Sequence, residues 1–305
     1  MNIYTDLACE AREMNADIEG VTEKTETDGE IEIKRIEILN NEAAEKLGKA
    51  KGVYVTIDAP QLVMRPLDLF ERVIERLAAE IRNLLKCRPE EATVLVIGLG
   101  NHNVTPDSLG PLTAEKIHVT RHIKEHVPEA FDFPVSAVCS IAPGVLGLTG
   151  VETFDVVKGV VENVKPDVII AVDSLASRRA ARISSTVQLC DAGISPGSGV
   201  GNLRDSISRE SLGVPVIAIG VPLVVYASTI SQDTISLIAD ETGLHNDEEK
   251  LKALAEKVIS EHIGPMIVTP KDIDSIVEDM SDIIAAAINR ALFGEKYEEV
   301  KNLTA

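Results

Sequence analysis

The sequence predicts an α/β protein in which a mostly parallel or mixed twisted sheet carries helices on both faces, as a three-layer sandwich. Two observations support this class. Short, uninterrupted apolar runs recur from Thr93 onward, such as TVLVIG and DVIIAV, and such runs are typical of strands buried on both faces. Stretches with helical periodicity separate these runs, and the alternation indicates strand–helix units around one sheet. A strand-rich N-terminal elaboration precedes them.

The N-terminal part predicts two strands and one long helix. In GEIEIKRIEILN (29–40) isoleucine alternates with charged residues, which indicates a strand with one buried and one solvent face. The segment GVYVTIDAP (52–60) is interpreted in the same way. Pro66 then begins a helix over 67–87, because apolar residues recur there at spacings of three and four. The acidic residues before 29 are expected to be mobile.

From residue 93 the expected strands and helices alternate. The expected strands are 93–98, 134–140, 167–173, 185–190 and 214–220. The expected helices are 111–126, 152–164, 227–239 and a tail helix over 271–294. No long linker or low-complexity segment divides the chain, so we expect residues 7–305 to form a single domain.

Composition excludes several classes of function. The formal net charge of -19 argues against direct binding of nucleic acid, since phosphate-binding proteins concentrate Lys and Arg. Aromatic residues make up 3% of the chain and tryptophan is absent, so base-stacking platforms are not expected. Four widely spaced cysteines indicate reduced thiols. No apolar run approaches the roughly 20 residues that span a bilayer, and no signal segment begins the chain. A soluble, cytoplasmic protein is predicted.

An Asp-Ser-Leu sequence occurs twice, beginning at Asp107 and at Asp173. Asp107 follows the strand 93–98, and Asp173 is expected to end the strand 167–173. Carboxyl ends of neighbouring parallel strands share one edge of a sheet, so the two carboxylates converge if these strands are neighbours. A close pair of this kind offers an acid and a base, which can activate water and protonate a leaving amine. The alternative is that Asp173 caps a helix and Asp107 begins a turn.

Two glycine-rich segments raise the question of nucleotide binding. GLGNHN (98–103) lacks the third glycine of a dinucleotide-binding loop, and its glycines are better explained by a tight turn beside Asp107. GISPGSGVGN (193–202) lacks the lysine of a phosphate-binding loop. We interpret it as a flap or a surface loop, and no cofactor is predicted.

Other chemistry-bearing residues have simpler explanations. His118, His122 and His126 are spaced by four residues, but the Glu of the H-E-x-x-H metal motif is replaced by Val119, so no metal ligand is predicted. Ser108 and Ser174 each follow an Asp, and neither lies in a G-x-S-x-G motif. Cys139 and Cys190 lie inside apolar strands, so they are expected in the core.

Four longer segments carry a resemblance to a known family. GLGNHNVTPDSLGP (98–111), APGVLGLTGVET (142–153), KPDVIIAVDSLASR (165–178) and DAGISPGSGVGN (191–202) together resemble the germination proteases of spore-forming bacteria. The resemblance implies an endopeptidase that degrades small acid-soluble spore proteins when spores germinate, in the cytoplasm of the spore core. It also implies a fold related to hydrogenase-maturation peptidases and assembly as a homotetramer. The two acids proposed as catalytic in the family match Asp107 and Asp173.

The same resemblance implies a self-processing zymogen. Family members cut themselves at a site like those of their substrates, where an acid is followed by an apolar residue and alanine. Asp6-Leu7-Ala8 matches this pattern, so we expect autocleavage between Asp6 and Leu7, with residues 1–6 as the pro-segment. The alternatives are an ordinary disordered terminus and, for the whole chain, a metal-dependent or non-catalytic relative of the maturation peptidases.

Overall fold

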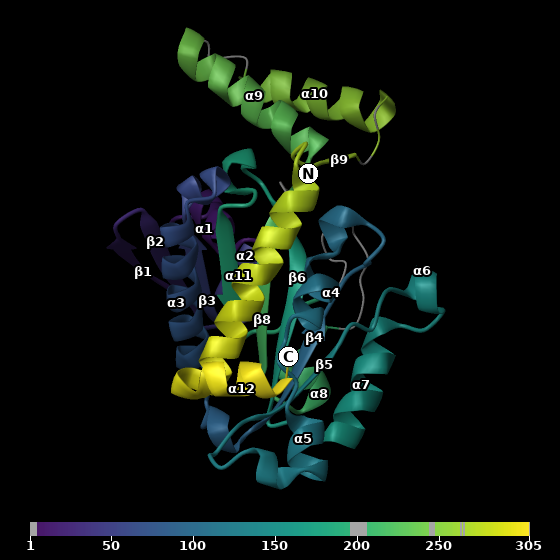
Figure 1. Ribbon diagram of the computed structural model, residues 1–305. Coiled ribbons are helices and arrows are strands. Elements are labelled where there is room, and N and C mark those ends of the chain that lie inside the picture. The colour runs from purple at the N-terminus through teal and green to yellow at the C-terminus, as the bar shows by residue number, and fades with distance from the viewer. Residues whose placement is uncertain (1–4, 196–205, 244–247, 263, 265, 305) are drawn as a thin grey trace.

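The computed structural model describes residues 5–195, 206–243, 248–262, 264 and 266–304 (Figure 1). Within these residues the strands form one sheet in the order β1-β2-β3-β7-β8-β6-β4-β5, with β9 beside β8. The strands are β1 Val21–Asp28, β2 Ile31–Ile38, β3 Gly52–Asp58, β4 Thr93–Gly98, β5 Ala137–Ile141, β6 Val168–Ser177, β7 Thr186–Cys190, β8 Val216–Tyr226 and β9 Ile267–Val268.

The sheet has a parallel half and an antiparallel half. Strands β5, β4, β6 and β8 are parallel to one another. Strands β7, β3, β2 and β1 continue the sheet from β8 with antiparallel pairing. The predicted mixed sheet is confirmed, and the strand-rich N-terminal elaboration is the outer part of its antiparallel half.

Helices cover both faces of this sheet (Figure 1). Helices α3, α4 and α11 lie on one face, and α1, α2 and α7 lie on the other. The helices are α1 Ala8–Met14, α2 Asn41–Leu47, α3 Leu67–Leu84, α4 Leu109–Glu115, α5 Arg121–His126, α6 Leu146–Thr149, α7 Thr153–Val164, α8 Arg209–Leu212, α9 Ala227–Thr242, α10 Glu248–His262, α11 Ile273–Phe293 and α12 Tyr297–Thr304.

Apolar periodicity explains the two longest packed helices. Helix α3 turns Leu69, Val73 and Leu77 toward the core, as the spacing of three and four predicts. Helix α11 packs beside α3 and buries most of its length, which fits its run of isoleucine and alanine. Alternate residues of the central strands face opposite layers, so Val96 packs toward α3 and α11 while Ile97 packs toward α7.

The structure corrects several boundaries. The helix expected over 111–126 is two helices, α4 and α5, and residues 116–120 between them are not helical. Strand β6 continues to Ser177, so Asp173 lies inside a strand and caps no helix. The acidic start is ordered from Thr5 onward as α1 and β1. Strand β1 carries no apolar pattern because it is an edge strand with little burial.

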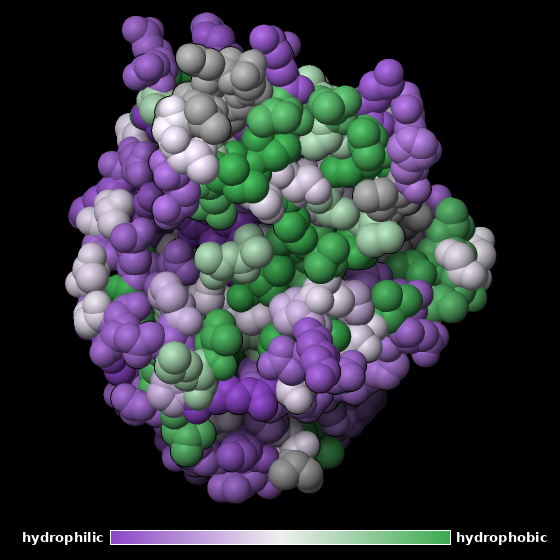
Figure 2. Space-filling model, turned by 90° about the horizontal axis from the view of Figure 1, so that it is seen from above, coloured by the Kyte–Doolittle hydropathy of each residue, from purple (hydrophilic) through white to green (hydrophobic). Residues whose placement is uncertain are grey.

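Helices α9 and α10 form a hairpin that projects beyond one end of the sheet (Figure 1). Figure 2 views the molecule from this end and shows apolar surface gathered there. Its exposed apolar side chains include Leu237, Ile238, Leu251, Leu254 and Met266. In the described part of the chain, no helix is both long enough and apolar enough to cross a membrane.

Candidate active site

Asp173 lies in a row of residues that crosses the centre of the sheet. It pairs with Gly220 on β8, and Gly220 pairs with Gln188 on β7. Directly paired residues project their side chains to the same face, so Asp173 and Gln188 face the layer that holds α1, α2 and α7. Gly220 contributes no side chain between them. With two strand spacings, the Cα atoms of Asp173 and Gln188 lie roughly 10 Å apart. The side chain of Leu175 lies over Gly220 between them.

Asp107 reaches the same region from the end of β4. It ends a single 3-10 turn, Thr105–Asp107, and the N–H of Asn101 donates to its Oδ2 at 2.8 Å. Gly100 makes this turn possible, because it adopts φ +113° and a Cβ there would lie 2.1 Å from the carbonyl oxygen of Asp107. Gly100 of GLGNHN therefore serves the turn beside Asp107, as the sequence predicts, while Gly98 allows close contact with Gly110.

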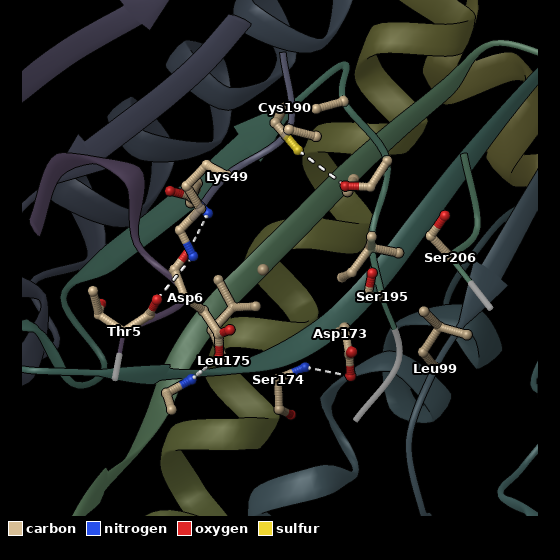
Figure 3. A pocket seen from close by; sticks show the side chains of 18 of the residues that line it. Thr5, Asp6, Lys49, Leu99, Asp173, Ser174, Leu175, Cys190, Ser195 and Ser206 are labelled. Carbon is tan, nitrogen blue, oxygen red and sulfur yellow. Dashed lines mark hydrogen bonds between the residues drawn. The ribbon is translucent and has the colours of Figure 1, made fainter. Parts of the chain in front are cut away.

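A cavity of about 1260 Å³ contains both carboxylates. Asp107, Asp173 and the first described residues of the chain, Thr5 and Asp6, all line it. Figure 3 shows Thr5, Asp6 and Lys49 on one side of this cavity and Asp173 on the other. The structure thus brings the two sequence-predicted aspartates together, although Asp173 arrives from the middle of a strand.

The two carboxyls differ in their electrostatics. Burial raises the pKa of Asp173 well above its usual range, and the neighbouring charge of Asp107 raises it further. Asp6 adds a smaller contribution in the same direction, while the Ser174 N–H, 2.8 Å from Oδ1, opposes the shift. Burial also raises the pKa of Asp107, against the hydrogen bond from Asn101. Such a pair retains a proton at a pH where an isolated Asp has lost it.

The chain's own N-terminal segment occupies one side of the cavity. The N–H of Asp6 donates to the carbonyl oxygen of Ala176 at 2.9 Å, and the N–H of Ala176 donates to the Asp6 carboxylate at 2.7 Å. Leu7 and Ala8, which follow, are completely buried. Asp6, the residue before the cleavage site predicted from the sequence, therefore lines the cavity.

The other candidates lie elsewhere or are buried. His118 precedes α5 and its Nδ1 contacts the hydroxyl of Thr304 at 2.9 Å, so the three histidines do not share one helix. Among the described residues, no three His, Cys, Asp or Glu side chains gather as metal ligands. Ser174 lies within β6, and its hydroxyl is buried. Burial raises the pKa of the Cys190 thiol to about 11, which suits a core residue.

Part of the predicted 193–202 loop lies outside the described residues. Residues 193–195 are described, and Ser195 lines the cavity, as Leu99 does (Figure 3). Residues 196–202 belong to the stretch that the structure does not describe.

Sequence reasoning missed Gln188, Gly220 and Lys49, which also line the cavity. Gln188 carries a usable signal, because it is a polar residue within the apolar strand STVQLC. A buried amide in such a strand needs partners, and that requirement points to a site or a local structural bond. Gly220 carries no local signal, since its role depends on which strands flank β8.

The fold and this cavity define an α/β protein in which two aspartates line one cavity. The germination protease family model matches residues 1–256 and 239–304, so the chain belongs to the germination protease family and is an endopeptidase.

Curated relatives agree along nearly the whole chain. The germination protease of Caldanaerobacter subterraneus subsp. tengcongensis is 46% identical over 307 residues, covering 96% of this chain and 94% of the relative. That of Clostridium acetobutylicum is 42% identical, covering 95% of each chain. That of Bacillus velezensis is 38% identical, covering 95% of this chain and 93% of the relative.

One solved structure is also similar, a NiFe hydrogenase maturation protease from Thermococcus kodakarensis KOD1. It is 15% identical with a TM-score of 0.35, and the match covers 68% of this chain and 97% of that chain.

Proposed function

We propose that this endopeptidase processes itself and then initiates degradation of small acid-soluble spore proteins during spore germination. In this proposal residues 1–6 are a pro-segment, residues 7–305 are one peptidase domain, and Asp107 and Asp173 are a catalytic pair of aspartic type. The protein acts in the cytoplasm of the spore core as a homotetramer. No metal ion or cofactor takes part in the proposed mechanism.

One observation carries the proposal: a buried and a half-buried carboxyl, both with raised pKa values, line a cavity beside an acid–apolar–Ala segment. Perturbed carboxyls in a cavity are typical of catalytic sites, and a peptide segment beside them supplies a bond to cleave. Family membership supports the protein substrates, since relatives are named for germination.

The environments of the two acids suggest their roles. Asp173 is the more buried and the more strongly shifted, so we assign it as the acid that holds the proton. Asp107 accepts the Asn101 N–H, which favours its charged form, and we assign it as the base.

With these roles, every proton and bond in the hydrolysis step has a donor and an acceptor. Asp107 takes a proton from water as the water oxygen bonds to the carbonyl carbon of the scissile peptide. Asp173 gives its proton to the leaving nitrogen as the C–N bond breaks. The products are a carboxylic acid and a free amine.

The experiment follows the intact mass of the purified full-length chain and its digestion of a small acid-soluble spore protein, with and without a chelator. We expect chelator-resistant loss of residues 1–6. Asp107→Asn and Asp173→Asn should each lower both reactions by about 10³-fold or more, because one proton transfer is removed. Asp132→Asn, an exposed acid, is the control and should react normally.

Three results would contradict the proposal. Normal digestion by either folded Asn variant excludes the carboxylate pair, and loss of activity with chelator favours the metal-dependent alternative. The pH profile is the third test. Because Asp173 must hold a proton, processing should fall as pH rises through its raised pKa, so activity that climbs steadily with pH excludes the assigned acid.

The apolar hairpin supports the proposed homotetramer, since contiguous exposed apolar surface commonly marks a protein interface. Light scattering should give the mass of four chains for the wild type. Leu254→Glu, which places a charge on the exposed face of α10, should give smaller species. A monomeric wild type would contradict this part of the proposal.

A further inference from the structure

The side chain of Gln188 brackets the Asp6–Leu7 peptide bond. Its Nε2 donates to the carbonyl oxygen of Asp6 at 3.1 Å, and its Oε1 accepts from the N–H of Ala8 at 2.7 Å. A primary amide offers a donor and an acceptor together, so one side chain holds the backbone on both sides of the bond. Gln188 is 7% exposed, which shields both hydrogen bonds from water.

The position of Gln188 relative to Asp173 places the bound peptide near a candidate catalytic acid. Both residues stand in the row Gln188, Gly220, Asp173 and face the same layer. Two strand spacings separate them, roughly 10 Å between Cα atoms. The side chain of Leu175 lies over Gly220 between them, since a Cβ at residue 220 would lie 2.5 Å from Cγ of Leu175.

The acidic residue before the bond has partners of its own. The Ala176 N–H donates to the Asp6 carboxylate, while the Asp6 N–H donates to the Ala176 carbonyl oxygen. Lys49 donates to the carbonyl oxygen of Thr5 at 2.8 Å and lies close enough for its charge to interact with Asp6. These contacts recognise a carboxylate at this position.

The next two positions are closed to large or polar residues. Leu7 is 0% exposed and packs in the apolar cluster beneath α1 and α2. Ala8 is 1% exposed, and a larger side chain would have to displace neighbours already in contact. The site as built therefore fits an acid, then an apolar residue, then a small one.

We infer that Gln188 is the positioning residue that holds the Asp6–Leu7 peptide bond for cleavage, through hydrogen bonds to the backbone on both sides of that bond. The inference rests on the proposed function and names a further residue of the same site.

The test replaces Gln188 by methionine, which keeps the length of the side chain and removes both hydrogen bonds. Gln188→Met should slow processing by about tenfold or more, because two bonds to the reacting peptide are lost. Gln61→Met, at an exposed position, is the matched control and should leave the rate of processing unchanged.

A second measurement is independent of cleavage. In full-length chains that carry Asp173→Asn, hydrogen exchange reports the bond from Ala8 N–H to Gln188 directly. Adding Gln188→Met should speed exchange of the Ala8 amide by about tenfold or more, and adding Gln61→Met should not.

The two measurements separate the possible failures. Unchanged Ala8 exchange in Gln188→Met overturns the inference, whatever the activity. Faster exchange with normal kinetics also overturns it, because Gln188 would then only anchor α1. If the wild-type chain neither shortens nor digests protein, the proposed function fails, and the exchange result alone shows whether Gln188 holds the segment.

Discussion

Close backbone contacts distinguish the parallel half of the sheet, whereas ion pairs distinguish the antiparallel half. In the parallel half, Gly98 and Gly110 let α4 touch β4 and β6. In the antiparallel half, Arg35 pairs with the buried Glu80, and Arg182 pairs with acids of α1 and β3. The two carboxylates come from the parallel half, and the N-terminal peptide contacts both halves, through Ala176 on β6 and Gln188 on β7. The candidate site lies where the two halves meet.

Gly110→Ala should produce the largest loss of stability. A Cβ at residue 110 would lie 2.2 Å from the Leu99 carbonyl oxygen and 2.6 Å from that of Val172, and backbone cannot rotate away. We expect a loss of about 4 kcal/mol or more in the free energy of unfolding, measured by urea denaturation. In the control, Gly159→Ala in α7, the new Cβ meets open space and should add about 0.5–1 kcal/mol. Equal stabilities would refute the close-contact description of the parallel half.

Arg182→Met tests the antiparallel half. Arg182 lies within 2.9 Å of Asp58 and Glu13 and within 3.4 Å of Glu10, which is fully buried. Removing the cation leaves buried acids without their counter-charge, so we expect a loss of about 3 kcal/mol in urea denaturation. Arg209→Met, at an exposed position, should change stability by less than about 0.5 kcal/mol. A similar small change in both variants would show that ion pairs do not hold this half.

Gly220→Ala tests the boundary between the halves. The new methyl would lie 2.5 to 2.9 Å from side-chain atoms of Leu175, which can rotate, so the expected loss is about 1–3 kcal/mol. The displaced Leu175 would crowd the cavity beside Gln188 and Asp173, and processing should slow as well. Mass spectrometry and urea denaturation measure the two effects. Wild-type processing in this variant would show that the packing of Leu175 over Gly220 is not needed for cleavage.

Asp173→Asn should change stability in the opposite direction, because it should be a gain. The folded-state pKa of Asp173 lies above its unfolded value, so the folded chain binds more protons and loses stability as pH rises between those two values. Asparagine removes this penalty, which is about 1.4 kcal/mol for each pKa unit. The gain should appear at pH 7 and vanish near pH 4, while Asp132→Asn shows none. A loss at pH 7 would mean that the Asp173 charge is stabilised in the fold.

Local periodicity was enough to predict the α/β class, the helices α3 and α11, and strand β4 with its correct bounds. Each of these depends on apolar residues repeated within one segment, so neighbouring residues contain the information. The same is true of Asp107, which the sequence places after β4 beside the glycines that shape its turn.

Only the tertiary structure decided how the site is assembled. Asp173, Gly220 and Gln188 form a row because β6, β8 and β7 are neighbours, and one of these pairings is antiparallel. Strand order is a non-local property, set by the burial of whole layers rather than by any one segment. The ordered start of the chain is decided in the same way, since Leu7 and Ala8 gain burial only against residues far along the sequence. The sequence alone therefore predicted Asp107, Asp173 and the Asp6–Leu7 bond as parts of a site. The fold determined that the two acids and Asp6 line the same cavity.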